Sequence, residues 1–300
     1  MAFDVVIVGG GPAGLAAALA LGRARKRVLL CDAGPRRNAA ATHINNFVTR
    51  DGTPPEEFRS IARQQLLRYP NVQVREERVI AISGQRGAFD VALTGAAVQA
   101  RRILLGTGMI DEMLPIEGFP ELWGRSIFQC PYCHGWESQD QRWGYLARAE
   151  MAAHFLPFSL QALAWTQHLV VFTNSSFEVP KQDRLQLEAA GIQIETEPVA
   201  RLVRQQDQLA AVELANGQQV RCELLFTAPP QQQVALIKSL DLAVDGEGFV
   251  QVDPMRRETS KPGIYASGDL TTRMQGAIMA AAAGTQAAAM INLDLMMETR

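Results

Sequence analysis

The fold of this chain is decided near its start, at residues 5–14, which read Val5-Val6-Ile7-Val8-Gly9-Gly10-Gly11-Pro12-Ala13-Gly14. An apolar strand runs into a glycine-rich turn, and a helix-like apolar run follows at residues 15–21. In this context the pattern G-x-G-x-x-G is typical of a dinucleotide-binding fold. The first glycine permits the turn, the second lets the backbone approach a pyrophosphate, and the third lets the helix pack closely on the strand. Free N–H groups at the helix start favour phosphate.

A second strand supports this interpretation. It covers residues 27–31 and ends at Asp32, which stands 21 positions after Gly11. At this spacing an acidic side chain accepts a hydrogen bond from a ribose hydroxyl in dinucleotide-binding folds. Arg36 and Arg37 follow, and they are candidates either for contacts with adenosine phosphates or for a solvated loop. Strand, turn, helix and acid together predict an α/β fold that begins with a Rossmann-like domain.

Composition narrows the class of protein further. A chain of 300 residues is longer than one small core usually needs, so we expect two domains. The net charge is −2 and Lys and Arg form no large block, which argues against a nucleic-acid partner. The apolar run at residues 276–297 is long enough for a membrane span, but polar residues interrupt it. We therefore expect a buried Ala-rich helix, no membrane segment and, since no signal-peptide pattern opens the chain, a cytoplasmic protein.

The chemistry of the chain is indicated by residues 130–134, which read Cys-Pro-Tyr-Cys-His. A Cys-x-x-Cys pair is either redox-active or half of a metal site, and zinc requires a second Cys/His pair at ligand spacing. Cys31 and Cys222 are single and lie in or beside apolar runs, so we expect buried filler and no metal site. Pro131 suits the first position of a helix, and a helix N-terminus lowers the pKa of a thiol.

Three further segments resemble the FAD-binding motifs of flavoproteins with two dinucleotide-binding domains. Residues 259–269 end in Gly-Asp, and in that family the Asp holds the ribityl chain of the flavin. Residues 104–108, which read Leu-Leu-Gly-Thr-Gly, resemble the segment that closes the FAD domain. Residues 275–277, Gln-Gly-Ala, open the Ala-rich run, whose N-terminus faces the flavin pyrimidine in the family. With the first motif, these segments make the chain similar to the low-molecular-weight thioredoxin reductases over nearly its whole length.

This resemblance implies an α/β fold with two Rossmann-like domains of the FAD/NAD(P)-binding type, the second inserted into the first. Residues 1–112 and 245–300 would form the FAD-binding domain, and residues 113–244 the inserted domain that carries the thiol pair. It also implies FAD as cofactor, a homodimer, and a loop around Asn46 that lines the flavin. The expected cofactor-binding residues are Gly9, Gly11, Pro12, Ala13, Gly14, Asp32, Asn46, Gly106, Thr107, Gly108, Gly268, Asp269, Gln275, Gly276 and Ala277, and the expected catalytic residues are Cys130, Cys133 and His134.

The resemblance also assigns roles around the thiol pair. Cys133 would face the flavin, and Cys130 would exchange with the substrate. Thioredoxin reductases have an Asp after the pair as proton donor and acceptor, whereas this chain has His134, whose imidazole titrates near neutrality and suits proton transfer. The pattern Cys-x-x-Cys-His-Gly-aromatic-Glu resembles the dithiol oxidases that close the disulfide of gliotoxin and holomycin and pass electrons from FAD to oxygen. The alternative for His134 is a packed turn residue without a role in proton transfer. Trp136 is either a core residue or a wall of the substrate site, and Glu137 is interpreted as a first-turn acid favoured by the helix dipole.

The second dinucleotide motif, expected in the inserted domain, is degraded. A strand at residues 143–146 leads to Ala147 and Ala149, where the family has glycines, and Glu150 adds a negative charge near the phosphate site. A methyl group at Ala149 would intrude where the backbone must approach the pyrophosphate. After the strand at residues 168–172, the Arg-rich segment that grips the 2′-phosphate is missing. We expect the NADPH site to be degraded or absent, and the alternative is a variant that still binds NADPH weakly.

These observations predict an FAD-dependent thiol–disulfide oxidoreductase with Cys130 and Cys133 as its redox pair. One hypothesis is an enzyme independent of NADPH that acts on a small-molecule dithiol or disulfide, for example an oxidase that uses oxygen. Another is a thioredoxin-reductase-like enzyme that takes electrons from NADPH or a ferredoxin-type donor and acts on a thioredoxin-like protein. The third is an FAD-binding redox sensor without turnover, and the intact thiol pair argues against it.

Overall fold

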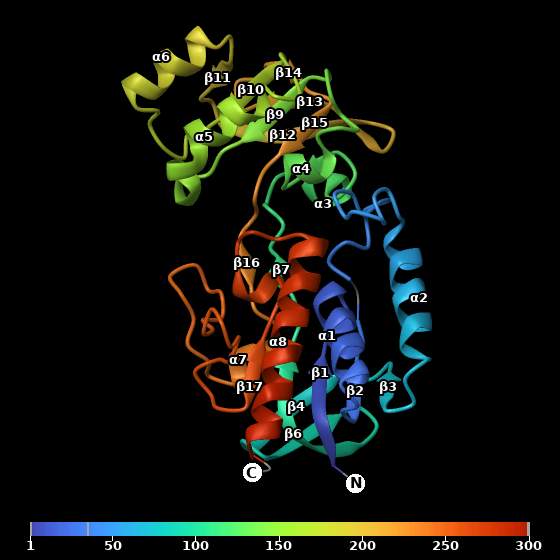
Figure 1. The fold of residues 1–300 in the computed structure, drawn as a ribbon. Helices are drawn as coiled ribbons and strands as arrows, with labels where there is room; N and C mark the ends of the chain where they lie inside the picture. The colour runs from blue at the N-terminus through green and yellow to red at the C-terminus, as the bar shows by residue number, and fades with distance from the viewer. Residues whose placement is uncertain (1, 35, 299–300) are drawn as a thin grey trace. The chain divides into compact units, whose positions relative to one another are not determined.

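The computed structural model describes residues 2–34 and 36–298. The chain divides into two compact units: unit 1 comprises Met1–Asp111 and Gln231–Arg300, and unit 2 comprises Glu112–Pro230. Unit 2 is thus inserted into the sequence of unit 1 (Figure 1). Each unit combines a parallel sheet with helices, and this confirms the predicted α/β fold class.

The chain returns to unit 1 at Gln231, whereas the sequence-based expectation places residues 231–244 in the inserted domain. The segment belongs to unit 1 because helix α7 (Ala235–Ser239) and the residues after it bury their apolar side chains in the core of that unit. The buried members are Leu236, Ile237, Leu240 and Leu242. An apolar pattern shows that a segment is buried, but it does not show which core receives it.

Unit 1 is built on a seven-stranded sheet in the order β3-β2-β1-β6-β5-β4, with β17 also paired to β6. The strands are β1 (Phe3–Val8), β2 (Val28–Cys31), β3 (Val72–Arg75), β4 (Val79–Gln85), β5 (Ala88–Leu93), β6 (Ala97–Leu105) and β17 (Ile264–Ala266). All pairs among β1, β2, β3, β6 and β17 are parallel, and β4 and β5 add antiparallel strands. A separate antiparallel ladder joins β7 (Ile110–Asp111) to β16 (Gln231–Gln232), where the chain leaves and re-enters the unit.

Two helices lie side by side on one face of this sheet, α1 (Pro12–Arg23) and α8 (Ala277–Glu298) (Figure 1). They approach closely because Gly284 faces Ala13, and a Cβ at Gly284 would collide with the Ala13 backbone. Helix α2 (Pro55–Leu66) adds to the same face. The predicted strand–turn–helix at the N-terminus is therefore present and packed against the C-terminal helix.

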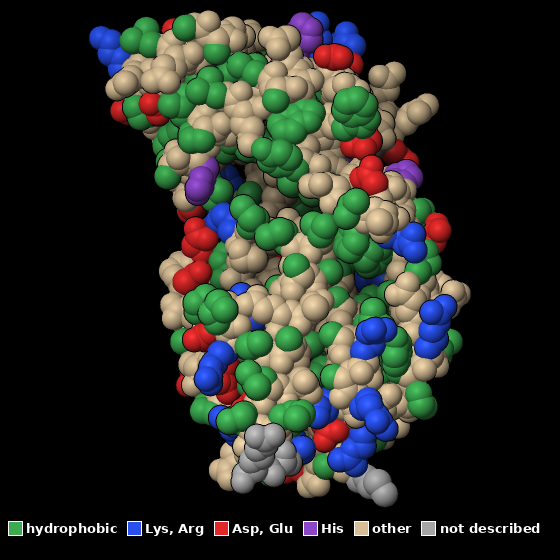
Figure 2. Space-filling model, viewed as in Figure 1, with side chains coloured by type: hydrophobic (Ala, Val, Ile, Leu, Met, Phe, Trp, Pro, Cys, Tyr) green, Lys and Arg blue, Asp and Glu red, His purple; other side chains and the backbone are tan. Residues whose placement is uncertain are grey.

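Helix α8 is buried on one side only, so the expected buried Ala-rich helix has an exposed face. That face consists of residues three or four apart, and they are Ile278, Ala282, Thr285, Ala289, Leu293 and Met296. Figure 2 shows mostly hydrophobic and uncharged groups where α8 lies in front. Across residues 2–34 and 36–298, no helix is long and apolar enough to cross a membrane.

Unit 2 contains a parallel five-stranded sheet in the order β11-β10-β9-β15-β8 and an antiparallel sheet β12-β13-β14. The strands are β8 (Ile127–Phe128), β9 (Trp143–Leu146), β10 (Leu169–Phe172), β11 (Gln193–Glu195), β12 (Val199–Gln205), β13 (Gln208–Leu214), β14 (Gln219–Arg221) and β15 (Leu224–Phe226). The helices are α3 (Phe119–Leu122), α4 (Pro131–His134), α5 (Ala152–Ala162) and α6 (Lys181–Ala189), with a 3₁₀ turn at Ala149–Met151 before α5. The thiol pair lies at α4, directly after β8.

Candidate functional site

The glycine-rich turn after β1 forms an open cradle at the start of α1. A Cβ at Gly9, whose φ is +108°, would collide with the carbonyl oxygen of Gly106, and one at Gly14 would collide with the carbonyl oxygen of Gly9. Beside Gly11, in contrast, a Cβ would meet no atom within 4 Å. Gly11 is the N-cap of α1 and no side chain caps this helix, so its first N–H groups face that space. The turn therefore suits a pyrophosphate, with Pro12 and Ala13 as the first helical residues.

Asp32 closes one side of this cradle at the end of β2. Its Oδ1 accepts a hydrogen bond from the backbone N–H of Gly10 over 3.1 Å. Its Oδ2 pairs with Arg59 and with Arg63, the latter over 3.2 Å. Both arginines come from α2, and sequence analysis did not identify them. They stand one turn apart on an amphipathic helix, a pattern that predicts a helix face but not its partner.

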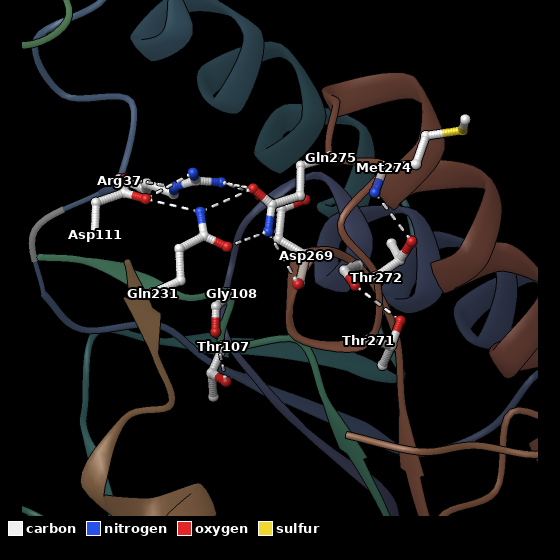
Figure 3. Close-up of polar contacts among 11 residues, drawn as sticks. Arg37, Thr107, Gly108, Asp111, Gln231, Asp269, Thr271, Thr272, Met274 and Gln275 are labelled. Carbon is white, nitrogen blue, oxygen red and sulfur yellow. Dashed lines mark hydrogen bonds and ion pairs between the residues drawn. The ribbon is translucent and has the colours of Figure 1, made fainter. Parts of the chain in front are cut away.

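Asp269 and Gln275, expected to bind the flavin, are held together by Arg37 (Figure 3). The Nη1 of Arg37 donates to Asp269 over 3.0 Å and to the Gln275 side-chain oxygen over 2.5 Å. The Gln275 amide in turn donates to Gln231 over 2.8 Å. Burial raises the pKa of Asp269, and the charge of Arg37 opposes this effect. Two expected cofactor residues and one arginine considered only as a phosphate contact or loop residue thus form a single network.

The remaining expected cofactor residues lie in loops and at the ends of secondary-structure elements of unit 1. Gly106, Thr107 and Gly108 follow β6, and the Thr107 hydroxyl and the Gly108 carbonyl are 3.5 Å apart. Gly268 has a φ of +81° and precedes the 3₁₀ turn that carries Asp269, while Gly276 and Ala277 start α8. Asn46 lies in an exposed loop, where its backbone N–H donates to Asp51 over 2.7 Å. A role of Asn46 in cofactor binding stays a prediction.

The thiol pair of unit 2 is arranged to hold a thiolate on Cys130. Cys130 is the N-cap of α4, and its carbonyl accepts a hydrogen bond from the Cys133 N–H over 3.2 Å. A hydrogen bond with the Cys133 side chain, aided by the backbone N–H groups of Cys133 and Tyr132, lowers the pKa of Cys130 to about 6 against the opposing effect of burial. At neutral pH Cys130 is therefore mainly the nucleophilic thiolate.

His134 follows the pair directly and is packed rather than solvated. Its ring stacks on Phe128 with the centroids 4.0 Å apart and the planes 12° apart. Burial lowers the pKa of His134 to about 4, and a hydrogen bond with the Cys130 backbone only partly offsets this. Within the described chain the buried Nδ1 has no hydrogen-bond partner. The expectation that this imidazole titrates near neutrality is therefore corrected: His134 is neutral at pH 7, with one nitrogen left to accept a proton.

Two aromatic rings beside the thiols are exposed. Tyr132 is 60% and Trp136 is 72% exposed, and of the aromatic residues that the structure describes only these two are exposed. Tyr132 is held edge-on against Trp165 and accepts a hydrogen bond from Gln161 over 2.9 Å. Trp136 is therefore not a core residue, while the ring of Trp165 packs against Tyr132 and Trp143. Glu137 is also exposed.

A supporting layer lies beneath the thiol segment. The Ser138 hydroxyl donates to the His134 carbonyl over 2.5 Å, and the Ser138 carbonyl accepts from the Trp143 indole over 2.8 Å. Trp143 is fully buried and packs on Phe226 with ring centroids 4.5 Å apart. Gly135 must be glycine, because a Cβ there would collide with the Pro131 carbonyl and the Trp165 ring. The segment is thus fixed to the sheet of unit 2 by aromatic packing.

The turn after β9 is where a Rossmann-like unit would bind its second nucleotide. Here Ala147 is buried, and the helix is reached through a 3₁₀ turn rather than through glycines. Arg148 donates to the Ala228 carbonyl over 2.7 Å and pairs with Glu150 over 3.1 Å. The acidic side chain of Glu150 therefore lies beside the turn, and the side chain of Arg148 already has two partners within the protein.

The other two cysteines are buried and inert. Burial raises the pKa of Cys31 and of Cys222 to about 12, and the Cys222 thiol donates to the Leu224 carbonyl over 2.8 Å. A Cβ at Gly144 would approach the Cys222 sulfur to 2.7 Å, so this thiol acts as packing. Both match the expected role of buried filler. In the described chain no group of three or more His, Cys, Asp or Glu side chains could hold a metal ion.

Fold and site together define a flavoprotein disulfide oxidoreductase. Comparison with protein families gives a match to the pyridine nucleotide-disulphide oxidoreductases over residues 3–288. The chain therefore belongs to this family and is an FAD-dependent disulfide oxidoreductase of the thioredoxin reductase-like kind. The residues fit FAD, because the cradle at Gly11 is open while the glycines around it allow no side chain.

Individual relatives agree with this assignment. The solved structure of an oxidoreductase from Agrobacterium tumefaciens is 36% identical, with a TM-score of 0.92 over 99% of both chains. Thioredoxin reductase aclD of Aspergillus oryzae is 32% identical over 95% of this chain and 94% of its own. Thioredoxin reductase sirT of Leptosphaeria maculans is 29% identical over 98% of this chain and 94% of its own.

Proposed function

We propose that this protein oxidises a small-molecule dithiol to its disulfide, with oxygen as the final electron acceptor and without NADPH. The observation that carries the proposal is the turn after β9, where Arg148 and Glu150 form an ion pair in place of a glycine cradle, while Cys130 and Cys133 remain intact. The overall reaction is balanced: the dithiol loses two electrons and two protons to form a disulfide, and oxygen gains them to form hydrogen peroxide. When bound, FAD supplies the two-electron acceptor between the thiols and oxygen.

The thiol steps follow from the geometry of α4. A substrate thiolate attacks the Cys130 sulfur of the oxidised pair, and Cys133 leaves as a thiolate. The second substrate thiolate then attacks the substrate sulfur of this mixed disulfide, and Cys130 leaves. A thiolate with a pKa of about 6 is a good leaving group at neutral pH. The neutral Nδ1 of His134, buried and without a hydrogen-bond partner in the described chain, accepts the proton that a substrate thiol loses as it becomes the attacking thiolate, and its pKa of about 4 makes this protonation transient.

The surroundings of Cys130 support a compact, hydrophobic substrate. The exposed rings of Tyr132 and Trp136 stand on either side of Cys133 in the sequence, and aromatic faces favour flat apolar groups. Stable protein partners usually bury about 800 Å² on each side. Two isolated rings flanked by exposed polar residues such as Glu137 and Gln139 supply only a small apolar patch. A small dithiol is therefore favoured over a thioredoxin-like protein.

The second candidate function is that of a thioredoxin reductase. Its support is that two of the relatives above are named thioredoxin reductases, and this chain matches each of them over 94% of its length. In this case electrons would come from NADPH or a ferredoxin-type protein and pass outward through Cys130. The third candidate, a redox sensor without turnover, retains less support because the pKa of Cys130 is lowered to about 6, as a reactive thiol requires.

Anaerobic flavin spectroscopy separates these functions. We expect a small aliphatic or aromatic dithiol to bleach the flavin under argon, and air to restore the colour with one peroxide formed per disulfide. NADPH at micromolar concentration should leave the spectrum unchanged. Rapid bleaching by NADPH would establish the reductase instead, and a flavin that no dithiol bleaches would refute the oxidase. Cys130→Ser should abolish bleaching by dithiol, whereas Cys222→Ser, a buried thiol of the same unit, should not.

We further propose a homodimer and a cytoplasmic location. The exposed face of α8 supports the dimer, because its uncharged residues recur at the spacing by which two helices pack together. A second copy of the same helix would cover this face. The location rests on the reduced thiols that the proposed chemistry needs.

A further inference from the structure

Asp111 and Gln231 mark the two points at which the chain crosses the border of unit 1. They are paired residues of the β7–β16 ladder, Asp111 being the last residue before unit 2 and Gln231 the first after it. The Asp111 side chain is only 4% exposed, so its charge requires partners. The Gln231 amide donates to its Oδ1 over 2.8 Å, which ties the two crossings together through side chains as well as backbone.

Arg37 supplies the opposite charge. Its Nε and Nη2 donate to the two carboxylate oxygens of Asp111 over 2.7 and 2.8 Å, a bidentate arrangement. Its remaining Nη1 is directed to Asp269 and Gln275, as described above (Figure 3). One guanidinium thus reaches both the chain crossings and the residues expected at the flavin.

The planarity of the guanidinium makes this arrangement a coupling. Its five donors are fixed in one plane. Arg37 can therefore bind Asp111 on one side and Asp269 with Gln275 on the other only when these residues have one relative distance and orientation. Gln275 adds a second link, because it accepts from and donates to Gln231 over 3.1 and 2.8 Å. Displacement of Asp269 or Gln275 therefore breaks hydrogen bonds at Asp111 and Gln231, and the reverse also holds.

We infer that Arg37 is a positioning residue that couples the FAD-binding residues Asp269 and Gln275 to β7 and β16, the strands at which the chain leaves and re-enters unit 1. The inference goes beyond the proposed function, because it holds for any electron donor or acceptor. Coupling of this kind is reciprocal. Bound FAD orders the two crossing strands, and ordered crossing strands retain FAD.

The test uses the full-length holoenzyme and two measurements. The first is the rate of FAD release after dilution, followed by flavin fluorescence, and the second is amide hydrogen exchange in peptides covering residues 109–112 and 230–233. Arg37→Met should release FAD about tenfold faster or more, since it removes hydrogen bonds between charged groups. It should also raise exchange in both peptides. Arg201→Met is the matched control, because Arg201 also binds a carboxylate in a bidentate manner, that of Glu213, but does so on the exposed surface of unit 2.

Further variants keep the test decisive if Arg37→Met fails to fold. The double variant Arg37→Met/Asp111→Asn removes the charge of the buried Asp111 together with that of its arginine partner, yet it should still release FAD faster. Gln231→Ala is milder, and the coupling requires it to speed FAD release even though Gln231 is not expected to touch the cofactor. Arg37→Lys, which keeps the charge and loses the fork, should be intermediate. FAD release at the wild-type rate in the foldable variants, or exchange that rises only around residue 37, would overturn the inference.

Discussion

Replacing Cys133 by Ala should move the pKa of Cys130 from about 6 toward its ordinary value of 9.0, because the Cys133 side chain is the largest influence that lowers it. At pH 7 a thiol of pKa 6 is about 90% thiolate, and one of pKa 9 is about 1%. The thiolate of higher pKa is more nucleophilic, by roughly 15- to 30-fold over three pH units. The net loss of alkylation rate at pH 7 is therefore only about three- to six-fold, while the midpoint of the pH profile moves by up to three units.

The pH profile is thus the informative measurement. Reduced protein is alkylated with iodoacetamide between pH 5 and 10, and the modified cysteines are identified by peptide mass. Cys31 and Cys222 serve as internal controls, because burial raises the pKa of each to about 12. Cys130→Ala reports the profile of Cys133 alone and shows which thiol gives the low midpoint.

Two results would refute the reasoning. A wild-type midpoint near pH 9 for Cys130 would mean that the thiol pair does not hold a thiolate. An unchanged midpoint near pH 6 in Cys133→Ala would mean that backbone N–H groups and not the second thiol stabilise the charge. In the latter case the assignment of roles within the pair would lose its electrostatic basis.

Three other outcomes are expected. His134 has a pKa of about 4 in the folded state and about 6.5 when unfolded, so the unfolded chain binds more protons between these pH values. Between pH 7 and pH 4.5 the free energy of unfolding in urea should therefore fall by roughly 2–3 kcal/mol more for the wild type than for His134→Phe. Equal losses of stability would contradict the burial of this ring. Gly14→Ala should destabilise unit 1 by about 3 kcal/mol or more, because its Cβ would collide with the turn. Gly11→Ala should instead unfold like wild type in thermal melts of the apoprotein and yet bind FAD poorly. Tight FAD binding by Gly11→Ala would argue against the proposed cradle. Leu293→Glu on the exposed face of α8 should give monomers in sedimentation while Leu185→Glu, an equally exposed position in unit 2, should not, and a wild-type monomer would exclude the dimer.

Features that depend on a few neighbouring residues could be predicted from the sequence. The turn at residues 9–14 is one example, because the glycines are required by contacts within the turn and with the adjacent strand end. The redox pair is another, since a helix start and two thiols three positions apart are local. Inertness of Cys31 and Cys222 followed from apolar runs around them, which the structure bears out.

Features that depend on distant segments were missed or misplaced. Arg37 could not be distinguished from a solvated loop residue, because its partners Asp111 and Asp269 lie 74 and 232 positions away. The pairing of Asp32 with two arginines of α2 could not be predicted either, because no sequence motif indicates this contact. The second boundary was placed at residue 245 because an apolar segment does not specify its core, and the structure puts residues 231–244 in unit 1.

The amino-acid sequence by itself determined the class of this protein. The strand, the glycine turn, Asp32 and the thiol pair each lie within a short segment whose geometry depends on neighbouring residues. Only the tertiary structure decided the state of the site. The pKa of His134 depends on Phe128 and on burial from other strands, and the network of Arg37 depends on three segments meeting in space. Charge states and long-range hydrogen bonds follow from what surrounds a group after folding, and that surrounding is not contained in any one stretch of sequence.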